Sequence, residues 1–254
     1  FVSGTVSGDR RVGGVVGDNN YVSGSAATIE DSYSLADVTG SQIVGGVVGR
    51  ERMAPPEISG TVKRTYAAGD TTVTSGTYDG GIAGRNEGGE VKDSYWDKGT
   101  TNENDAIGDD IGGQSSNLNG YGSTSDTSPA PEMQGSSASS NMGNLDFSSN
   151  WDTVVSGGDA TADGYPILSA LDRQAQLEAQ DVHAYAGGDG STDNPYEIAN
   201  WYHLNNTREN LDAEFILTAD LDSNTAGYDD VASSSANGGN GFDPIGDDGS
   251  RFTG

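Results

Sequence analysis

The sequence predicts a mostly β protein, built as a β-helix (solenoid) of short strands with small helical capping segments. Two observations lead to this prediction. Short segments rich in Val, Ile, Thr and Tyr recur in one order, and glycines separate them. β-Branched and aromatic residues suit a pleated strand, while glycine permits corners and close backbone approach. A narrow solenoid can be stable with few apolar residues because each coil buries its face against its neighbours.

The glycine-rich element is the clearest repeat. The string Gly-Gly-Val-Val-Gly occupies residues 13–17 and 45–49, and the variant Gly-Gly-Ile-Ala-Gly occupies residues 80–84. The offsets are 32 and 35 residues. Fixed spacing of this kind is the sequence signature of repeat architectures. We therefore expect one coil of the solenoid for each copy.

Two further elements keep step with the first. One contains a tyrosine and occurs three times: Asp31-Ser32-Tyr33, Arg64-Thr65-Tyr66 and Asp93-Ser94-Tyr95. The other has alternating residues and is read at three places: Val2-Ser3-Gly4-Thr5-Val6, Val22-Ser23-Gly24-Ser25 and Ile58-Ser59-Gly60-Thr61-Val62. In a strand, alternate residues of such a segment lie on one face. A β-sandwich with similar strands is the alternative architecture, but it does not require all three elements to recur in order.

These elements resemble GLUG-type repeats, which occur in large bacterial and archaeal surface proteins and adhesins. The resemblance continues beyond the repeats. Asp93–Asp97 resembles the aromatic end of a last coil, the segment from Pro131 to Trp151 resembles a closing segment, and Gly164–Leu168 resembles its last strand. Gly188–Ile198 resembles the opening of a new array. The family describes a scaffold and implies no particular chemistry.

The domain organisation follows from this resemblance and from composition. Residues 1–172 are expected to form the C-terminal coils and cap of one solenoid, with 98–128 as a long surface loop and 129–172 as a cap over the open end. Residues 173–194 are predicted to be a linker helix and hinge. Residues 195–254 are predicted to be the N-terminal part of a following solenoid module. The sequence begins within the repeat pattern, so we expect a piece of a longer chain.

The charge composition indicates adaptation to salt. The chain has 39 acidic and 12 basic residues, and its net charge is −27. Repulsion within such a chain is screened at molar salt, where the Debye length falls to ~3 Å. This composition is typical of halophilic archaea; an acidic disordered chain is the alternative, against which the periodic apolar residues argue. Nucleic acid and anionic membrane surfaces are excluded as partners because both attract Lys and Arg. No apolar run is long enough to insert in a membrane.

The sequence predicts no catalytic residues. Cysteine is absent, so thiol chemistry and thiolate metal sites are excluded. The two histidines, His183 and His203, lie in no nucleophile motif, and structural roles are expected for both. Carboxylates are so abundant that a pair chosen from sequence would carry no information about glycoside hydrolysis. We therefore predict that the chain is not an enzyme and has no cofactor other than a candidate Ca²⁺ ion.

The candidate metal ligands are Asp220, Asp222 and Asn224. Their alternating spacing is that of the oxygen ligands that open a calcium loop. An EF-hand is excluded because Thr225 stands where the loop needs glycine and Val231 where it needs glutamate. Salt-adapted, solvated turns are the alternative interpretation. The segment is thus a weak calcium candidate.

Asn205 is the candidate glycosylation site. The sequon Asn205-Asn206-Thr207 has the required pattern, although short sequons also arise by chance. We expect modification to depend on exposure to a secretory pathway.

The function expected from these features is structural. We predict an extracellular protein of a haloarchaeal cell surface or filament, in which tandem solenoid modules contact neighbouring copies or modules head-to-tail and serve adhesion. The first alternative is a glycan-binding adhesin that recognises surface glycans through residues 98–128 and 222–250. The second alternative is a polysaccharide-degrading β-helix enzyme.

Overall fold

A computed structural model of the chain forms two compact units. The first consists of Phe1–Thr153 and Pro166–Leu171, and the second of Val154–Tyr165 and Asp172–Gly254. Among the described residues, strands outnumber helices, which confirms a mostly β protein with few helices. The structure describes residues 1–20, 27–54, 58–76, 78–155, 160, 162–180, 182, 185–225, 227–246 and 251–253.

Four parallel sheets make up most of the first unit. Two sheets have three strands each: β1 (Thr5–Ser7), β5 (Asp37–Gly40) and β10 (Thr71–Val73), then β2 (Arg11–Gly13), β6 (Ile43–Gly45) and β11 (Tyr78–Gly80). The other two each have a path of four parallel strands: β3 (Val16–Asn19), β7 (Val48–Ala54), β12 (Ala83–Glu87) and β14 (Ile107–Asp110), then β4 (Thr28–Ser34), β9 (Thr61–Ala67), β13 (Glu90–Asp97) and β15 (Gln114–Tyr121). The short strand β8 (Ile58–Ser59) pairs antiparallel with β7.

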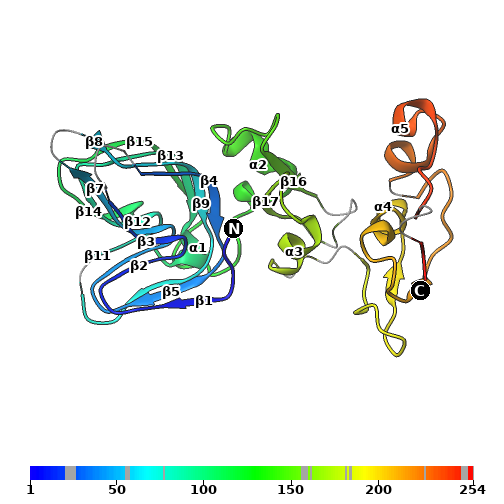
Figure 1. Ribbon diagram of the computed structural model, residues 1–254, viewed down its shortest axis with the longest axis horizontal. Helices are drawn as coiled ribbons and strands as arrows, with labels where there is room; N and C mark the ends of the chain where they lie inside the picture. Colours follow the sequence, from blue (N-terminus) through cyan, green and yellow to red (C-terminus); the bar gives the residue numbers. More distant parts are fainter. Residues whose placement is uncertain are drawn as a thin grey trace. The chain divides into compact units, whose positions relative to one another are not determined.

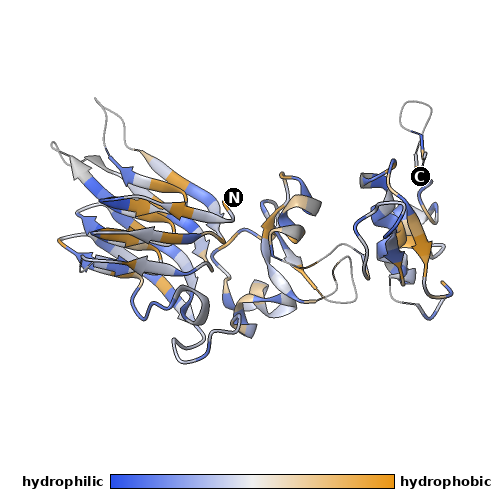
Figure 2. Ribbon diagram, turned by 90° about the horizontal axis from the view of Figure 1, so that it is seen from below, coloured by the Kyte–Doolittle hydropathy of each residue, from blue (hydrophilic) through white to orange (hydrophobic). Residues whose placement is uncertain are grey.

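The chain visits these sheets in the same order on each circuit, and we call one circuit a rung. Thr5 pairs with Asp37 and Val16 with Val48, so equivalent positions of the first two rungs are 32 residues apart. Figure 1 shows β1 beside β5 on one side of the circuit, and β4, β9 and β13 together on another. Figure 2 shows the strands as stacked layers in which hydrophobic residues recur at the same place. The register therefore stacks like residues on like residues.

The repeated glycines stand at a corner of each rung. A Cβ atom on Gly45 would overlap the carbonyl oxygen of Val48 and the backbone nitrogen of Gly84. One on Gly46 would overlap the carbonyl oxygen of Gly81 and the side chain of Ala67. Close backbone approach, rather than a left-handed backbone conformation, is what requires glycine here. The predicted corner role of this element is thereby explained.

The interior of the stack is filled by small aliphatic residues. The larger cluster contains nine buried residues: Ile29, Val47, Val48, Val62, Ala67, Ile82, Ala83, Val91 and Trp96. A smaller cluster near the first and second sheets contains Val12, Ala36, Val38 and Val44. Each side chain packs on its equivalents in adjacent rungs, so burial depends on having a neighbouring rung.

Residues 98–128 do not form the long loop that we expected. They contain the short helix α1 (Lys98–Thr101) and the strands β14 and β15, which pair in parallel with β12 and β13. The chain thus adds a fourth, partial rung after Asp97. Its strands are polar because they lie at an edge of each sheet, where one neighbour is missing and solvent is near. This polarity is why apolar periodicity failed to reveal them.

The tyrosines of the second repeat element lie on the outer face of their sheet. A residue with positive φ precedes each of them by two positions: Asp31 (44°), Arg64 (50°) and Asp93 (49°). The residues that follow Tyr33 and Tyr66 point the other way, since Ser34 and Ala67 contact the corner glycines of the interior. Tyr33 and Tyr66 stack on each other, with ring centroids 4.8 Å apart.

Residues 129–153 and 166–171 of the first unit cover this tyrosine-bearing face rather than the open end that we expected. The chain from 129 to 171 contains a 3-10 turn (Pro131–Met133), α2 (Gly135–Asn141), β16 (Trp151–Val154) and β17 (Gly164–Leu168). Trp151 lies 5.9 Å from Tyr33 and 5.7 Å from Tyr66, measured between ring centroids. The Tyr66 hydroxyl donates to the carbonyl oxygen of Pro166 at 2.6 Å. A column of large aromatic rings must be removed from water, and this segment supplies the cover.

The third repeat element is assigned differently by the structure. Residues 5–7 form β1 in the first sheet, whereas residues 61–67 form β9 in the fourth sheet. The two similar strings are therefore not equivalent positions, because Thr61 pairs with Thr28. Similarity over a few alternating residues was not enough to fix the side of the rung. Residues 22–25 lie outside the described part of the chain.

The second unit has a small parallel sheet among short helices. The strands β18 (Tyr196–Ile198) and β19 (Phe215–Leu217) pair in parallel, with Tyr196 opposite Phe215. Asn200 caps the helix between them by accepting from the His203 backbone at 2.8 Å. The helical segments are α3 (Arg173–Glu178), α4 (Trp201–Asn206), a 3-10 turn (Thr207–Glu209), a π-helical turn (Tyr228–Ala232) and α5 (Ala236–Gly239).

Candidate functional site

The calcium candidate is an exposed, self-bonded turn. The Asp222 carboxylate accepts from the backbone N–H of Asn224 at 2.7 Å and from the Thr225 hydroxyl at 3.2 Å. The backbone hydrogen bond from Asn224 lowers the pKa of Asp222. In the part of the chain that is described, no group of three or more His, Asp or Glu side chains is arranged to hold a metal. Calcium binding by Asp220, Asp222 and Asn224 stays a prediction.

The glycosylation candidate lies within α4. The Asn205 side-chain oxygen accepts from the Arg208 guanidinium at 2.8 Å. Thr207, the hydroxyl residue of the sequon, is buried and donates to the Leu204 carbonyl at 2.8 Å. Modification of Asn205 would have to displace its contact with Arg208, and it too stays a prediction.

His203 is buried and held by its neighbours. Its Nδ1 accepts from the backbone N–H of Ala199 at 3.2 Å, and its Nε2 lies 3.2 Å from the side-chain nitrogen of Asn200. These contacts fix the ring next to the start of α4. His183 lies outside the described residues.

A column of charged residues crosses the rungs next to the glycine corner. Asp18, Arg50, Arg85 and Asp109 occupy equivalent positions on β3, β7, β12 and β14. The first three each follow directly after the last glycine of a repeat string. Stacking in parallel register places like positions one strand apart, so oppositely charged side chains become neighbours.

Ion pairs link this column across three strand boundaries. Arg50 holds Asp18 through two hydrogen bonds, Nε to Oδ1 at 3.1 Å and Nη2 to Oδ2 at 2.7 Å. Glu87 on β12 lies 3.5 Å from Arg50 and 3.0 Å from Arg85, and Arg85 lies 2.9 Å from Asp109. Arg50 is only 8% exposed, so its guanidinium is fixed in place. A fork-like pair of this kind gives geometric definition as well as energy.

A cleft lies beside the column on the first unit. It has a volume of about 260 Å³ and extends over three rungs. The lining residues are Arg10, Arg11, Gln42, Ile43, Arg50, Gly76, Tyr78 and Arg85. Arg85 lies over the ring of Tyr78, 5.1 Å from its centroid. We call this feature the arginine cleft.

A second column, next to the charged one, is polar and buried. Asn19, Glu51 and Asn86 are register partners, and Asn19 donates to Glu51 Oε2 at 2.7 Å. The other oxygen of Glu51, Oε1, has no hydrogen-bond partner among the described residues. Burial raises the pKa of Glu51 from its ordinary value of 4.5 to about 8. The Glu51 carboxyl is therefore mostly protonated at neutral pH.

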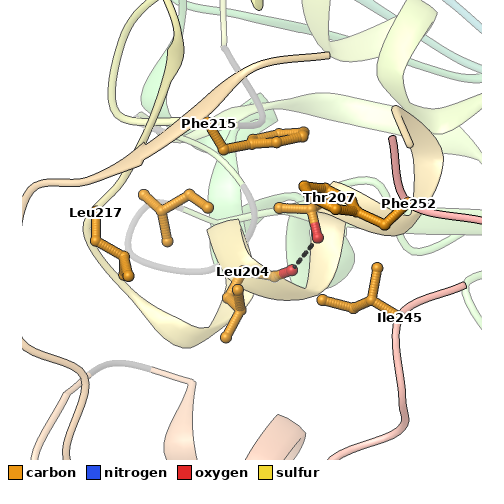
Figure 3. A pocket seen from close by; sticks show the side chains of 7 residues that line it. Leu204, Thr207, Phe215, Leu217, Ile245 and Phe252 are labelled. Atoms are coloured by element: carbon orange, nitrogen blue, oxygen red, sulfur yellow. Dashed lines mark hydrogen bonds between the residues drawn. The ribbon is translucent and has the colours of Figure 1, made fainter. Parts of the chain in front are cut away.

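The second unit has an apolar cavity. Its volume is about 390 Å³, and six apolar side chains and one threonine surround it: Ile198, Leu204, Thr207, Phe215, Leu217, Ile245 and Phe252. Figure 3 shows Leu204, Phe215 and Ile245 around this space, with the bond from the Thr207 hydroxyl to the Leu204 carbonyl beside it. Leu217 remains 61% exposed at the edge. The residues that the structure describes therefore leave one side of the cavity open.

Sequence reasoning missed both columns and the arginine cleft. The signal was present, because aligning the strings at 13–17, 45–49 and 80–84 also aligns the two residues that follow each. That alignment places Asp18 with Arg50 and Arg85, and Asn19 with Glu51 and Asn86. Arg10, Arg11 and Tyr78 could not be found in this way because they precede the repeat and come from unlike sequences.

The fold and these columns define an acidic, repetitive protein of stacked parallel strands. In the described part of the chain, no helix is long and apolar enough to cross a membrane. A similar protein is Halomucin of Haloquadratum walsbyi (strain DSM 16790 / HBSQ001), which is 32% identical over 191 residues. The match covers 75% of this chain but 2% of Halomucin, so the chain spans a small fraction of its relative's length.

The other two comparisons give no match. No protein-family model matches the chain, so the GLUG resemblance stays a prediction. No solved structure matches it either. The fold is therefore described from its own strand register alone.

Proposed function

We propose that the chain is a non-catalytic structural segment of a cell-surface protein of a halophilic archaeon, in which the first unit is a β-solenoid module. The observation that carries this proposal is the parallel register of equivalent positions over successive rungs. Such a stack grows by adding rungs and offers length and stiffness rather than a reaction centre. The surface location is supported by the similarity to a haloarchaeal protein, Halomucin.

The composition supports a place in concentrated salt. Acidic residues outnumber basic residues by 39 to 12, and the chain would repel itself strongly in dilute buffer. Molar salt reduces the Debye length to ~3 Å and removes most of that repulsion. An extracellular protein of a halophile meets such salt directly.

Contacts between modules are part of the proposal. β1, β2, β3 and β4 each pair with a strand of the second rung and have no partner on their other side among the described strands. Exposed strand edges of this kind recruit another strand or must be covered. We propose that neighbouring rungs, from the same protein or from another copy, stack on them head-to-tail.

Surface labelling tests the location. Antibodies raised against residues 1–171 should label intact cells of the source organism, and brief protease treatment of those cells should remove the signal. An antibody against a cytoplasmic protein is the control for cell integrity. Labelling only after lysis would contradict the proposal, and so would turnover of acidic or neutral polysaccharides by the purified chain.

A further inference from the structure

We propose that the arginine cleft binds a single sugar ring that carries one oxyanion group, either a carboxylate or a sulfate ester. This binding activity goes beyond the proposed structural role and does not depend on it. The cleft consists of described residues from three rungs of the first unit, and its arginines are Arg10, Arg11, Arg50 and Arg85.

The charge of the cleft runs against that of the chain. The whole sequence contains nine arginines and has a net charge of −27, yet four of the arginines line this one cleft. Three carboxylates pair with them, namely Asp18, Glu87 and Asp109. Arg10 is exposed and makes no ion pair with any described residue. The cleft therefore retains an excess of positive charge that an anionic ligand can neutralise.

The lining is rich in hydrogen-bond donors. A guanidinium group has five N–H donors and no acceptor, and its planar fork matches carboxylate and sulfate oxygens in pairs. Arg50 is already fixed by Asp18, and Arg85 by Asp109 and Glu87. Arg10, which has no ion pair among the described residues, and Arg11, whose Nη1 pairs with Asp18 at 3.1 Å, are the arginines with N–H donors left to reach the oxyanion. Binding to partly fixed donors loses less conformational entropy than ordering a mobile surface.

The size and mixed polarity of the cleft favour a sugar over a bare anion or an acidic peptide. Its 260 Å³ lies just below the ~300–1,000 Å³ of pockets for drug-sized ligands, which suits one ring and excludes a folded chain segment. A lone acetate or an aspartate side chain would leave most of it empty. Gln42 and Tyr78 add an amide and a hydroxyl, which can pair with ring hydroxyl groups.

High salt makes short-range contacts decisive. At molar KCl, charges separated by more than ~3 Å are largely screened, so long-range attraction between the arginines and the anionic ligand contributes little to affinity. Direct N–H···O bonds between guanidinium and oxyanion survive because they exclude the intervening salt solution. Affinity is therefore expected to fall only moderately as KCl rises.

Ligand-detected NMR and calorimetry on the full chain in molar KCl test the proposal. The probes are galacturonate and galactose 6-sulfate, compared with galactose, acetate, inorganic sulfate and a hexaglutamate peptide. We expect binding of at least one charged sugar, and at least ~10-fold weaker binding of the other probes. The paired variant Arg10→Gln/Arg11→Gln should weaken binding of the charged sugar by ~10-fold or more.

Arg52→Gln is the matched control. Arg52 lies on the same strand as Arg50 and pairs with Glu87, but it does not line the cleft. This variant should bind like the unaltered chain. If the paired variant unfolds by circular dichroism, Arg10→Gln alone replaces it, since Arg10 makes no ion pair within the described part of the chain.

Several results would overturn the proposal. Equal binding of galactose would remove the charge requirement, and equal binding of acetate or inorganic sulfate would reduce the cleft to a general anion site. Tighter binding of hexaglutamate would assign it to an acidic protein segment instead. Equal losses in Arg52→Gln and in the paired variant, or no binding of either charged sugar, would also reject it.

Discussion

The two units bury their apolar side chains to different extents. In the first unit, Val44, Val48 and Val62 are fully buried although each belongs to a strand of seven residues or fewer. In the second unit, Ile216 and Leu217 on β19 are 50% and 61% exposed. Both units use short parallel strands. The first unit, however, repeats them over several rungs, whereas the described residues of the second unit form a single parallel pair, β18 and β19.

Burial of apolar side chains in this chain therefore depends on repetition. A rung of small residues cannot enclose its own interior, and it becomes buried only when an equivalent rung stacks on it. Among the described residues of the second unit, β18 and β19 have no such neighbouring rung, and the cavity of about 390 Å³ is partly open there.

The largest effect is expected from Trp151→Ala. The indole packs on Tyr33 and Tyr66 and donates to Asp31 at 3.2 Å, so its loss uncovers the tyrosine-bearing face. We expect the first unit to lose ~3–5 kcal/mol of stability. Urea unfolding in molar KCl measures this. Tyr66→Phe keeps the ring but removes the hydroxyl that donates to Pro166, and it should lose ~1 kcal/mol; equal effects would contradict the covering role.

Truncating one aliphatic residue in each unit tests the comparison itself. Ile82 is fully buried between rungs, and Ile82→Ala should destabilise the first unit by ~2–5 kcal/mol. Leu217→Ala removes a mostly exposed side chain and should change stability by ~0.5 kcal/mol or less. Differential scanning calorimetry of both variants provides the measurement. Similar losses would show that the two units are equally well packed.

Glu51 should make stability depend on pH. Its pKa is about 8 in the folded chain against an ordinary value of 4.5, so between these values unfolding releases a proton. Stability therefore falls as pH rises from about 4.5 to 8, by ~1.4 kcal/mol per unit. Glu51→Gln cannot ionise, and its advantage over the unaltered chain should grow across that window.

A charge-matched variant controls this experiment. Glu132→Gln removes an exposed carboxylate, and the stability difference from the unaltered chain should stay nearly constant with pH. Urea unfolding at a series of pH values supplies the comparison. A constant difference for Glu51→Gln as well would mean that the buried carboxyl is not protonated.

The smallest effect is expected from calcium. Trp201 donates to the Asp222 carbonyl at 2.9 Å, so its fluorescence reports on the turn that holds Asp220 and Asn224. Millimolar CaCl₂ at constant ionic strength should stabilise the second unit by ~1 kcal/mol or less. The variant Asp220→Asn/Asp222→Asn should abolish the response. Absence of a saturable change, or an equal response to Mg²⁺, would reject the calcium site.

Much of the fold could be predicted where sequence and structure repeat together. The glycines at 13, 14, 45 and 46 marked corners correctly because no other residue fits the close backbone contact there. The strand character of the tyrosine elements was also readable. The mostly β class followed from these segments alone.

The other features of the fold and the site could not be predicted from sequence because they depend on which strands and rungs become neighbours. β15 is polar since it stands at a sheet edge, so its sequence lacks the apolar signal of β13. The place of Trp151 depends on a tyrosine column that forms only when rungs stack. The arginine cleft combines Arg10 and Tyr78, which precede different repeats and become neighbours through register.

Disulfide trapping is the most direct test of the stacked register. The chain has no cysteine of its own, so only the introduced pair can form a disulfide within it. Lys63 and Lys92 are register partners on β9 and β13, at an interstrand distance that a disulfide can span. Lys63→Cys/Lys92→Cys should therefore cross-link rapidly under mild oxidation. Glu30→Cys/Lys92→Cys, which skips the intervening strand, should not. Equal cross-linking of both pairs, or none in the first, would contradict the stacked rungs on which this account depends.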